Sequence, residues 1–164
     1  MKVNVAKLLK EPIGSSRDWD IGGEEADSGI QLNGRVRLLR TDRGILVSGK
    51  ISTKVDILCS RCLTHIEYPL DLDIEEEYFP TIDVSSGTPL PLPKDDGFPI
   101  GSNHILDLGE VVRQYILLAT PMKPLCRDEC QGLCPQCGEN LNYGPCSCKP
   151  PVDQRWVKLE GKDR

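Results

Sequence analysis

Apolar and polar side chains alternate along three stretches of the chain, which cover residues 34–40, 45–58 and 65–79. A period of two is typical of a β-strand that buries one face. Thr41-Asp42-Arg43-Gly44 joins the first two stretches and has the composition of a tight turn, with Gly44 suited to a left-handed backbone position. The pattern therefore predicts a β-hairpin followed by a third strand.

The third stretch has one apolar face and one strongly acidic face. The stretch ends in three consecutive acidic residues, Glu75, Glu76 and Glu77. A row of like charges along a strand is typical of a solvated face that discourages edge pairing. The same row could equally form a surface for a basic partner, and both interpretations stay open.

A wide apolar face recurs at helical spacing between Leu108 and Ala119. Asp107 is suited to the N-cap position and Glu110 follows three residues later, as in a capping box. Pro121 cannot continue the helix. We therefore expect a helix over 107–119 that packs across the sheet.

The remaining segments carry weak periodicity. Residues 1–33 are expected to form an N-terminal arm, because 14–33 are dense in Gly, Ser, Asp and Glu, with Trp19 and Ile21 as isolated apolar points. Five prolines within 80–103 predict a flexible loop. The expected organisation is the arm, a β-rich core over 34–125, a cysteine-rich module over 126–148 and a tail over 149–164 that frays unless Trp156 docks.

The fold class predicted from these elements is α+β. It comprises a twisted antiparallel β-sheet, one main packed helix and a C-terminal cysteine-rich loop that binds zinc.

The eight cysteines supply the candidate chemistry. Zinc takes four soft ligands at tetrahedral corners, and a Cys-x2-Cys turn supplies two of them with little strain. Eight thiols therefore make two complete Zn²⁺ sites of four cysteines each. The predicted ligands are Cys59, Cys62, Cys126, Cys130, Cys134, Cys137, Cys146 and Cys148.

Two pairings of the ligands are open. In one, Cys59 and Cys62 are completed by Cys126 and Cys130, and Cys134 and Cys137 by Cys146 and Cys148. In the other, the Cys59 pair joins the Cys134 pair and leaves a poorer Cys-x3-Cys and Cys-x-Cys set. Spacing favours the first.

Other uses of the cysteines are weaker. Disulfides need an oxidising compartment, and the start of the chain lacks the apolar core of a secretion signal, so we expect a cytoplasmic protein. Iron–sulfur ligation is less typical of turns with Pro and Gly. A redox Cys-x2-Cys would want a helix N-terminus, whereas Cys59 and Cys62 follow a strand. His65 could replace a ligand, but a histidine on a strand surface is the simpler interpretation.

Charge is unevenly distributed over the 164 residues, whose net charge is −5. Residues 65–110 hold eleven acidic side chains and one basic side chain. An overall acidic protein is not suited to binding phosphates over its whole surface. A local basic group on the first hairpin and its cysteine turn could contact RNA, or could simply be a solvated face. Its members are Arg35, Arg37, Lys50, Lys54 and Arg61.

No sequence pattern indicates catalysis. All-cysteine shells leave zinc no open coordination position, and the chain has no His-Glu-x-x-His motif, phosphate-binding loop or Gly-x-Ser-x-Gly elbow. We expect no enzyme activity, no small-molecule substrate and no membrane span.

Several segments together resemble the YceD-type family, whose members are linked to accumulation of large-subunit ribosomal RNA. The resemblance covers about Gly34 to Leu141. It is carried by Cys59-Ser60-Arg61-Cys62-Leu63, by the acidic strand through Glu75-Glu76-Glu77-Tyr78-Phe79 and by Ile105-Leu106-Asp107-Leu108-Gly109-Glu110. Its most distinctive part is the run from Ile116 to Cys126 followed by Gly132-Leu133-Cys134-Pro135-Gln136-Cys137-Gly138.

The resemblance implies a role in ribosome biogenesis. Because no sequence pattern indicates catalysis, we expect a non-catalytic factor that supports ribosomal RNA accumulation or processing and large-subunit assembly. The expected partner is ribosomal RNA, or a ribosomal or assembly protein. A direct RNA binder would use the basic group, whereas a protein adaptor would use the acidic strand without touching RNA. The last cysteines, Cys146 and Cys148, lie at the margin of the resemblance.

Overall fold

The computed structural model describes residues 1–24, 30–91 and 97–148. The expected tail, 149–164, lies outside these residues. The described chain divides into two compact units. The first consists of Met1–Ile57 and Ile66–Pro124, and the second begins with Leu58–His65 and continues from Leu125.

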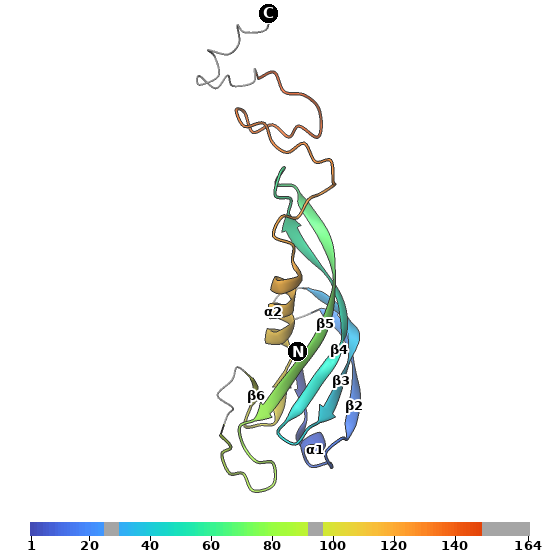
Figure 1. Ribbon diagram of the computed structural model, residues 1–164, viewed down its shortest axis with the longest axis vertical. Coiled ribbons are helices and arrows are strands. Elements are labelled where there is room, and N and C mark those ends of the chain that lie inside the picture. The colour runs from blue at the N-terminus through green and yellow to red at the C-terminus, as the bar shows by residue number, and fades with distance from the viewer. Residues whose placement is uncertain (25–29, 92–96, 149–164) are drawn as a thin grey trace, which may run out of the picture. The chain divides into compact units, whose positions relative to one another are not determined.

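The first unit is built on a five-stranded sheet of order β2-β3-β4-β5-β6 (Figure 1). The strand bounds are Ser16–Glu24 for β2, Gln31–Arg40 for β3, Ile45–Leu58 for β4, His65–Pro80 for β5 and Phe98–Ile100 for β6. The predicted hairpin and third strand are thus present, and strand β4 begins and ends where the alternation does.

The sheet is antiparallel except at one edge. Strands β2, β3 and β4 pair antiparallel, and β4 and β5 run in opposite directions (Figure 1). Strand β6 pairs with the end of β5 in parallel, with Tyr78 opposite Phe98. The expectation of an antiparallel sheet therefore needs this correction, which arises because the chain crosses over between Pro80 and Phe98 instead of turning back.

The expected N-terminal arm is also structured. It contains β1 (Lys2–Asn4), the short helix α1 (Ala6–Leu9) and the whole of β2. Strand β1 pairs antiparallel with β7 (Ile105–Asp107) in a separate two-stranded sheet. Strand β2 escaped prediction because only one of its faces packs, and Ile21 is its buried residue. Its position is set by the hydrogen bonds to β3 rather than by its own apolar pattern.

Residues 80–103 are not a uniform loop. Besides β6, they include an antiparallel bridge between Ile82 and Pro89. The carboxylate of Asp83 accepts hydrogen bonds from the backbone N–H groups of Ser85 and Ser86 and stabilises the turn between them.

The main helix, α2, covers Gly109–Ala119 and buries Val111, Val112 and Ile116 against the sheet. Its N-cap is Leu108, whose side chain cannot cap, and the predicted capping box is absent. Asp107 instead accepts the backbone N–H of Gly109 through Oδ1, at 2.9 Å. Glu110 is used by Arg113 and Gln114 on the same helix.

Glycine lets the β3–β4 turn approach strand β5 closely. Thr41 N–H donates to the carbonyl of Gly44 at 3.0 Å, and Gly44 N–H donates to Thr41 Oγ1 at 2.9 Å. Gly44 does not have the left-handed backbone that the sequence suggested. It is required because a Cβ atom there would lie 1.9 Å from the carbonyl oxygen of Tyr78.

Within the described residues, no helix is long and apolar enough to cross a membrane.

Candidate metal centres

The tip of the β4–β5 hairpin folds into a turn that presents two thiols. Cys59 N–H donates to the carbonyl of Thr64 at 2.9 Å, and Leu63 N–H donates to the carbonyl of Cys59 at 3.0 Å. Leu63 closes the turn with φ at 56°, a left-handed value that is uncommon outside glycine. Both Cys59 and Cys62 are buried.

A second turn farther along the chain repeats this hydrogen-bond pattern. Cys134 N–H donates to the carbonyl of Glu139 at 2.8 Å, and Gly138 N–H donates to the carbonyl of Cys134 at 2.9 Å. Here the left-handed position belongs to Gly138, with φ at 75°. The two Cys-x2-Cys segments therefore form the same kind of turn, although only the second carries the Pro and Gly that reveal it in the sequence.

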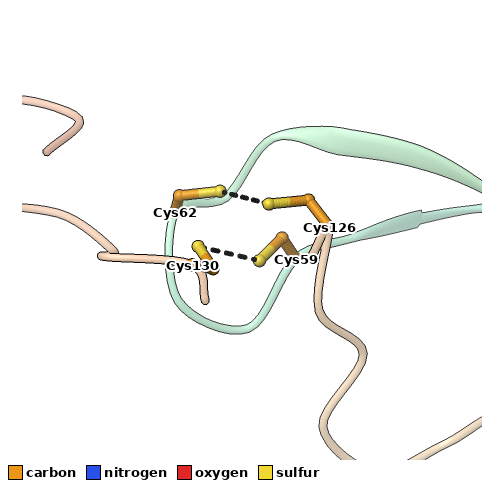
Figure 2. Close-up of side chains that lie close together, drawn as sticks. All are labelled: Cys59, Cys62, Cys126 and Cys130. Atoms are coloured by element: carbon orange, nitrogen blue, oxygen red, sulfur yellow. Dashed lines mark hydrogen bonds between the residues drawn. The ribbon is translucent and has the colours of Figure 1, made fainter. Parts of the chain in front are cut away.

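The hairpin turn is completed by two cysteines from beyond helix α2. The sulfur atoms of Cys59, Cys62, Cys126 and Cys130 all lie within 4.8 Å of one another (Figure 2). Cys59 Sγ is 3.8 Å from Cys130 Sγ, and Cys62 Sγ is 3.6 Å from Cys126 Sγ. Three of the four residues are buried and Cys126 is exposed.

The second turn is completed locally. The sulfur atoms of Cys134, Cys137, Cys146 and Cys148 also lie within 4.8 Å of one another. Cys134 is buried, Cys137 is exposed, and the last two are half-buried. The structure thus brings the predicted ligands together in the first of the two pairings, and it does not form the exchanged sets.

The sulfur separations in the first group fit a tetrahedral metal shell. A Zn–S bond of about 2.3 Å in tetrahedral geometry separates two sulfurs by about 3.8 Å. The measured separations of 3.6 and 3.8 Å agree with that value. They are far longer than the bond of about 2.05 Å in a disulfide. All eight cysteines are free thiols in this structure.

Backbone groups around the turns favour thiolate. The backbone N–H of Cys62, followed by that of Arg61, lowers the pKa of Cys59 to about 6. The backbone N–H of Cys137 and then that of Gln136 lower the pKa of Cys134 to about 6. One thiol in each Cys-x2-Cys turn is therefore prepared to lose its proton, which metal binding requires.

A further thiol in each set has a raised pKa. Desolvation and then the neighbouring Cys62 thiol raise the pKa of Cys126 to about 12. The Cys137 thiol and desolvation raise the pKa of Cys148 to about 12. Four thiols this close cannot all ionise without a cation to compensate them, which is the electrostatic character of a metal site.

Two side chains that the sequence did not single out as site residues support the first set. Thr64 Oγ1 accepts a hydrogen bond from the Cys62 thiol at 3.2 Å. Asn142 Nδ2 donates to Cys130 Sγ at 3.4 Å, and Asn142 Oδ1 accepts the Gln131 N–H at 2.9 Å. Such contacts orient ligands and tune them.

Asn142 connects the two sets, since it lies in the loop between Cys137 and Cys146 and contacts a sulfur of the other set. Leu141 N–H donates to the carbonyl of Gly132 at 2.9 Å and holds this loop against the segment between the sets. In the sequence, only the tendency of Asn to form turns could have pointed to Asn142. His65 belongs to neither group of four cysteines.

The predicted basic group does not form one patch of unpaired cations. On the outer face of the sheet, Arg35 Nε donates to Asp20 at 2.6 Å and Arg37 Nε donates to Asp18 at 3.0 Å. Lys50 lies directly opposite Arg35 on the neighbouring strand. Those like charges are offset because Lys50 Nζ lies 3.9 Å from Asp73 Oδ2.

The other two members of the basic group are also engaged. Lys54 Nζ lies 3.6 Å from Glu67 Oε2. Arg61 belongs to the cysteine-rich unit, where Nη1 donates to the carbonyl of Cys130 at 2.9 Å. Arg61 therefore has a structural contact beside the first set of cysteines.

The acidic residues Glu75, Glu76 and Glu77 also differ in their contacts. Glu77 accepts hydrogen bonds from Thr41 Oγ1 at 2.7 Å and from Arg43 Nη2 at 3.3 Å. Glu76 accepts the Tyr115 hydroxyl at 3.0 Å, which ties β5 to helix α2. Glu75 is exposed. Two of the three glutamates therefore form hydrogen bonds within the protein. The exposed acidic row of β5 consists of Glu67, Asp71, Asp73 and Glu75.

Comparison with known proteins gives one family. The family described as "Large ribosomal RNA subunit accumulation protein YceD" matches residues 47–161. A protein of Zea mays named "Large ribosomal RNA subunit accumulation protein YCED homolog 1, chloroplastic" is 37% identical over 65 residues, which is 39% of this chain and 22% of the maize protein.

Relatives that match more of the chain carry no functional name. An uncharacterized protein of Mycobacterium tuberculosis is 28% identical over 134 residues, which is 81% of this chain and 62% of that protein. An uncharacterized protein of Mycobacterium leprae is 24% identical over 131 residues, or 80% and 58%. The chain thus spans about three fifths of the length of these relatives. No solved structure matches.

Proposed function

Because the chain belongs to the YceD family, we propose that it is a non-catalytic zinc-binding factor that supports accumulation and processing of large-subunit ribosomal RNA. The observation that carries the zinc part is the presence of two complete groups of four thiols, each with its sulfur atoms within 4.8 Å of one another. In the first group, separations of 3.6 and 3.8 Å suit a tetrahedral shell. A ribosome-related role is compatible with the cytoplasm, which we propose as its setting.

In this proposal each zinc ion is structural. Cys59 and Cys62 would hold one ion together with Cys126 and Cys130, so that the hairpin tip and the segment after α2 are joined. The other four cysteines would close the loop between Cys134 and Cys148. When bound, zinc supplies cross-links that the small unit lacks, because a short segment buries too little apolar surface to fold on that basis alone.

The arrangement supports a non-catalytic role. Four protein ligands complete a zinc shell and leave no position for water or substrate. A pocket of 630 Å³ lies over β3, β4 and β5. Its lining holds no cysteine or histidine, and two of its polar side chains are already used, Thr53 toward the Gln31 carbonyl and Ser52 toward Asp71.

A protein adaptor is the second candidate, and the charge distribution on the sheet favours it. Each basic side chain on the outer face has a carboxylate within ion-pair distance, so the face offers RNA little net positive potential. Exposed ion pairs are worth about 0–1 kcal/mol, and RNA phosphates could still displace some of them. The two candidates therefore differ in their response to salt and to charge reversal.

The role in ribosomal RNA is tested by genetic replacement in the source organism. The ratio of large-subunit to small-subunit ribosomal RNA should fall when the gene is deleted, recover with the unaltered gene, and fail to recover with Cys59→Ser/Cys62→Ser. Ser102→Ala is the matched control, because the residue is exposed and outside the cysteine-rich unit. An unchanged ratio in the deletion strain would refute the role.

Binding measurements with purified large-subunit ribosomal RNA distinguish direct RNA contact from the adaptor role. Direct contact predicts an affinity that falls steeply with salt, and a smaller salt slope for Arg35→Gln/Arg37→Gln. The adaptor predicts no specific RNA binding and capture of a basic ribosomal or assembly protein, which Glu75→Lys/Asp73→Lys should abolish.

A further inference from the structure

Strand β2 presents a long open edge. It runs for nine residues, Ser16–Glu24, and among the described residues it is hydrogen-bonded to β3 alone. In Figure 1 it forms the border of the sheet, on the side opposite β6. An edge strand leaves a row of backbone N–H and C=O groups available for another strand.

Strand β2 lacks several of the usual devices that block such an edge. Proteins protect edge strands with proline, with charged side chains, especially lysine, or by keeping them short. Strand β2 is nine residues long and contains neither proline nor lysine, and its one basic side chain, Arg17, is already paired with Glu11. By contrast, the opposite border of the sheet is the three-residue strand β6, which contains Pro99.

The two faces of β2 give the edge a definite chemistry. Asp18 and Asp20 lie on the outer face, opposite Arg37 and Arg35 in the register with β3. Trp19 lies on the other face, opposite the buried Val36, and is still 46% exposed. A large aromatic side chain left half in solvent beside the core is suited to packing against one more strand.

We propose that β2 is a docking edge for an extended basic peptide segment, which adds antiparallel or parallel to the sheet. Its lysine or arginine side chains would lie beside Asp18 and Asp20 on the outer face. Its alternate, apolar side chains would cover Trp19 on the inner face. This is strand addition, in which backbone hydrogen bonds supply affinity and alternate side chains supply specificity.

Charge selects this occupant over a second copy of the chain. When two β2 strands pair antiparallel with their outer faces on the same side, the central registers place Asp20 opposite Asp20 or opposite Asp18. Like charges directly opposite one another destabilise a strand pair. A basic segment instead places each carboxylate between two cations, its own arginine on β3 and a lysine or arginine of the peptide.

This inference deepens the proposed function and rests on it for the biological setting, because it names the partner of the adaptor as a protein with an extended basic segment. Its test needs neither RNA nor bound metal. If the peptide does not bind, the proposed ribosomal RNA role and the zinc sites are unaffected. If the ribosomal RNA role or the zinc sites are refuted, peptide binding can still be measured.

The test uses the full chain and a synthetic ten-residue peptide, capped at both ends, in which lysine alternates with valine. Hydrogen–deuterium exchange should show new protection confined to residues 16–24. A peptide with glutamate in place of lysine tests the charge requirement. A lysine–valine peptide whose alternate amides are N-methylated tests the backbone requirement, and neither control peptide should protect β2.

Variants locate the site on the sheet. Asp18→Asn/Asp20→Asn should weaken binding roughly 2- to 30-fold, as expected for two cross-strand charge pairs. Asp18→Glu/Asp20→Glu should restore it, which a purely structural role of these residues would not predict. Asp71→Asn/Asp73→Asn is the matched control, since it removes the same charge from β5 on the same face and should change the affinity less than 2-fold.

Three results would overturn the proposal. One is equal loss of affinity in the β2 and β5 variants, which would indicate attraction by overall charge. Another is concentration-dependent dimerisation that protects β2 without peptide, which would make the edge an interface between copies. The third is stronger protection of 31–40 and 45–58 by polyuridylic acid than of β2 by the peptide, which would assign the sheet to RNA.

Discussion

Leu63 and Gly138 occupy equivalent positions in the two cysteine turns, and both have a left-handed backbone. Glycine adopts that conformation without steric cost, whereas an L-residue loses about 1–2 kcal/mol. The first turn keeps its leucine although that side chain is 58% exposed and contributes little packing. This difference between two otherwise similar turns gives a direct test at the scale of one residue.

Leu63→Gly should raise the free energy of unfolding of the metal-loaded protein by roughly 1 kcal/mol, because it removes backbone strain and little buried surface. Chemical denaturation measures the change. Leu58→Gly is the control, because Leu58 is similarly exposed but lies in strand β4, where glycine should destabilise. A loss of stability in Leu63→Gly would show that the leucine side chain contributes a contact that its exposure hides.

Gly44→Ala should lower the free energy of unfolding by about 1–3 kcal/mol, as overpacking does. The new Cβ atom would lie 1.9 Å from the backbone oxygen of Tyr78, so the strands must move apart. Gly22→Ala is the matched control, because a Cβ atom at Gly22 meets nothing within 4 Å. Equal stability of the two variants, measured by thermal unfolding, would contradict the close approach at the turn.

At the scale of elements, Tyr78 connects β5 to the segment that leads into α2. It is buried, and its hydroxyl donates to the carbonyl of Asp107 at 3.0 Å. Burial, followed by the nearby carboxylates of Asp107 and Glu76, raises the pKa of Tyr78 above its ordinary value of 10.0. The native state therefore holds this proton more tightly than the unfolded state does.

Tyr78→Phe should lower the free energy of unfolding at neutral pH by about 1 kcal/mol, through loss of one buried hydrogen bond. The stability that the raised pKa represents is present below pH 10 and is lost as the pH rises above that value. The variant should therefore lose less stability between pH 9 and pH 11 than the unaltered protein. Denaturation at a series of pH values measures the difference, and parallel losses in both proteins would contradict the assignment.

The secondary-structure elements differ in how well the sequence predicts them. Strands β4 and β5 were predictable, because alternation and turn residues agree over 45–58 and 65–79. Strand β2 was not, because an edge strand with two aspartates and two glycines receives its register from β3. The cysteine spacing favoured the observed pairing over the exchanged one. The contacts of Thr64 and Asn142 depend on segments that meet only in the folded chain.

At the scale of the whole molecule, the chain consists of two units with different sources of stability. The first has an apolar core of sheet and helix residues. The second has a small cluster around Cys59, Cys62 and Cys130, with Leu125 and Leu133 packed against it. Such a cluster buries little apolar surface, so metal ligation should provide most of its stability.

Removal of metal with a strong chelator should therefore affect only the second unit. Hydrogen–deuterium exchange should rise in 58–65 and 125–148 and stay unchanged in 45–57 and 66–80. Readdition of zinc should restore the protection. Uniform loss of protection in both units would show that the first unit also depends on the metal.

The central claim is that the eight cysteines form two zinc sites with the pairing seen in the structure, and native mass spectrometry of protein purified without chelator tests it most directly. The account predicts two zinc ions in the unaltered chain, one in Cys59→Ser/Cys126→Ser and none in Cys59→Ser/Cys134→Ser. One zinc ion in Cys59→Ser/Cys134→Ser and none in Cys59→Ser/Cys126→Ser would establish the exchanged pairing. Metal-free protein with mass losses for paired thiols would contradict the zinc sites altogether.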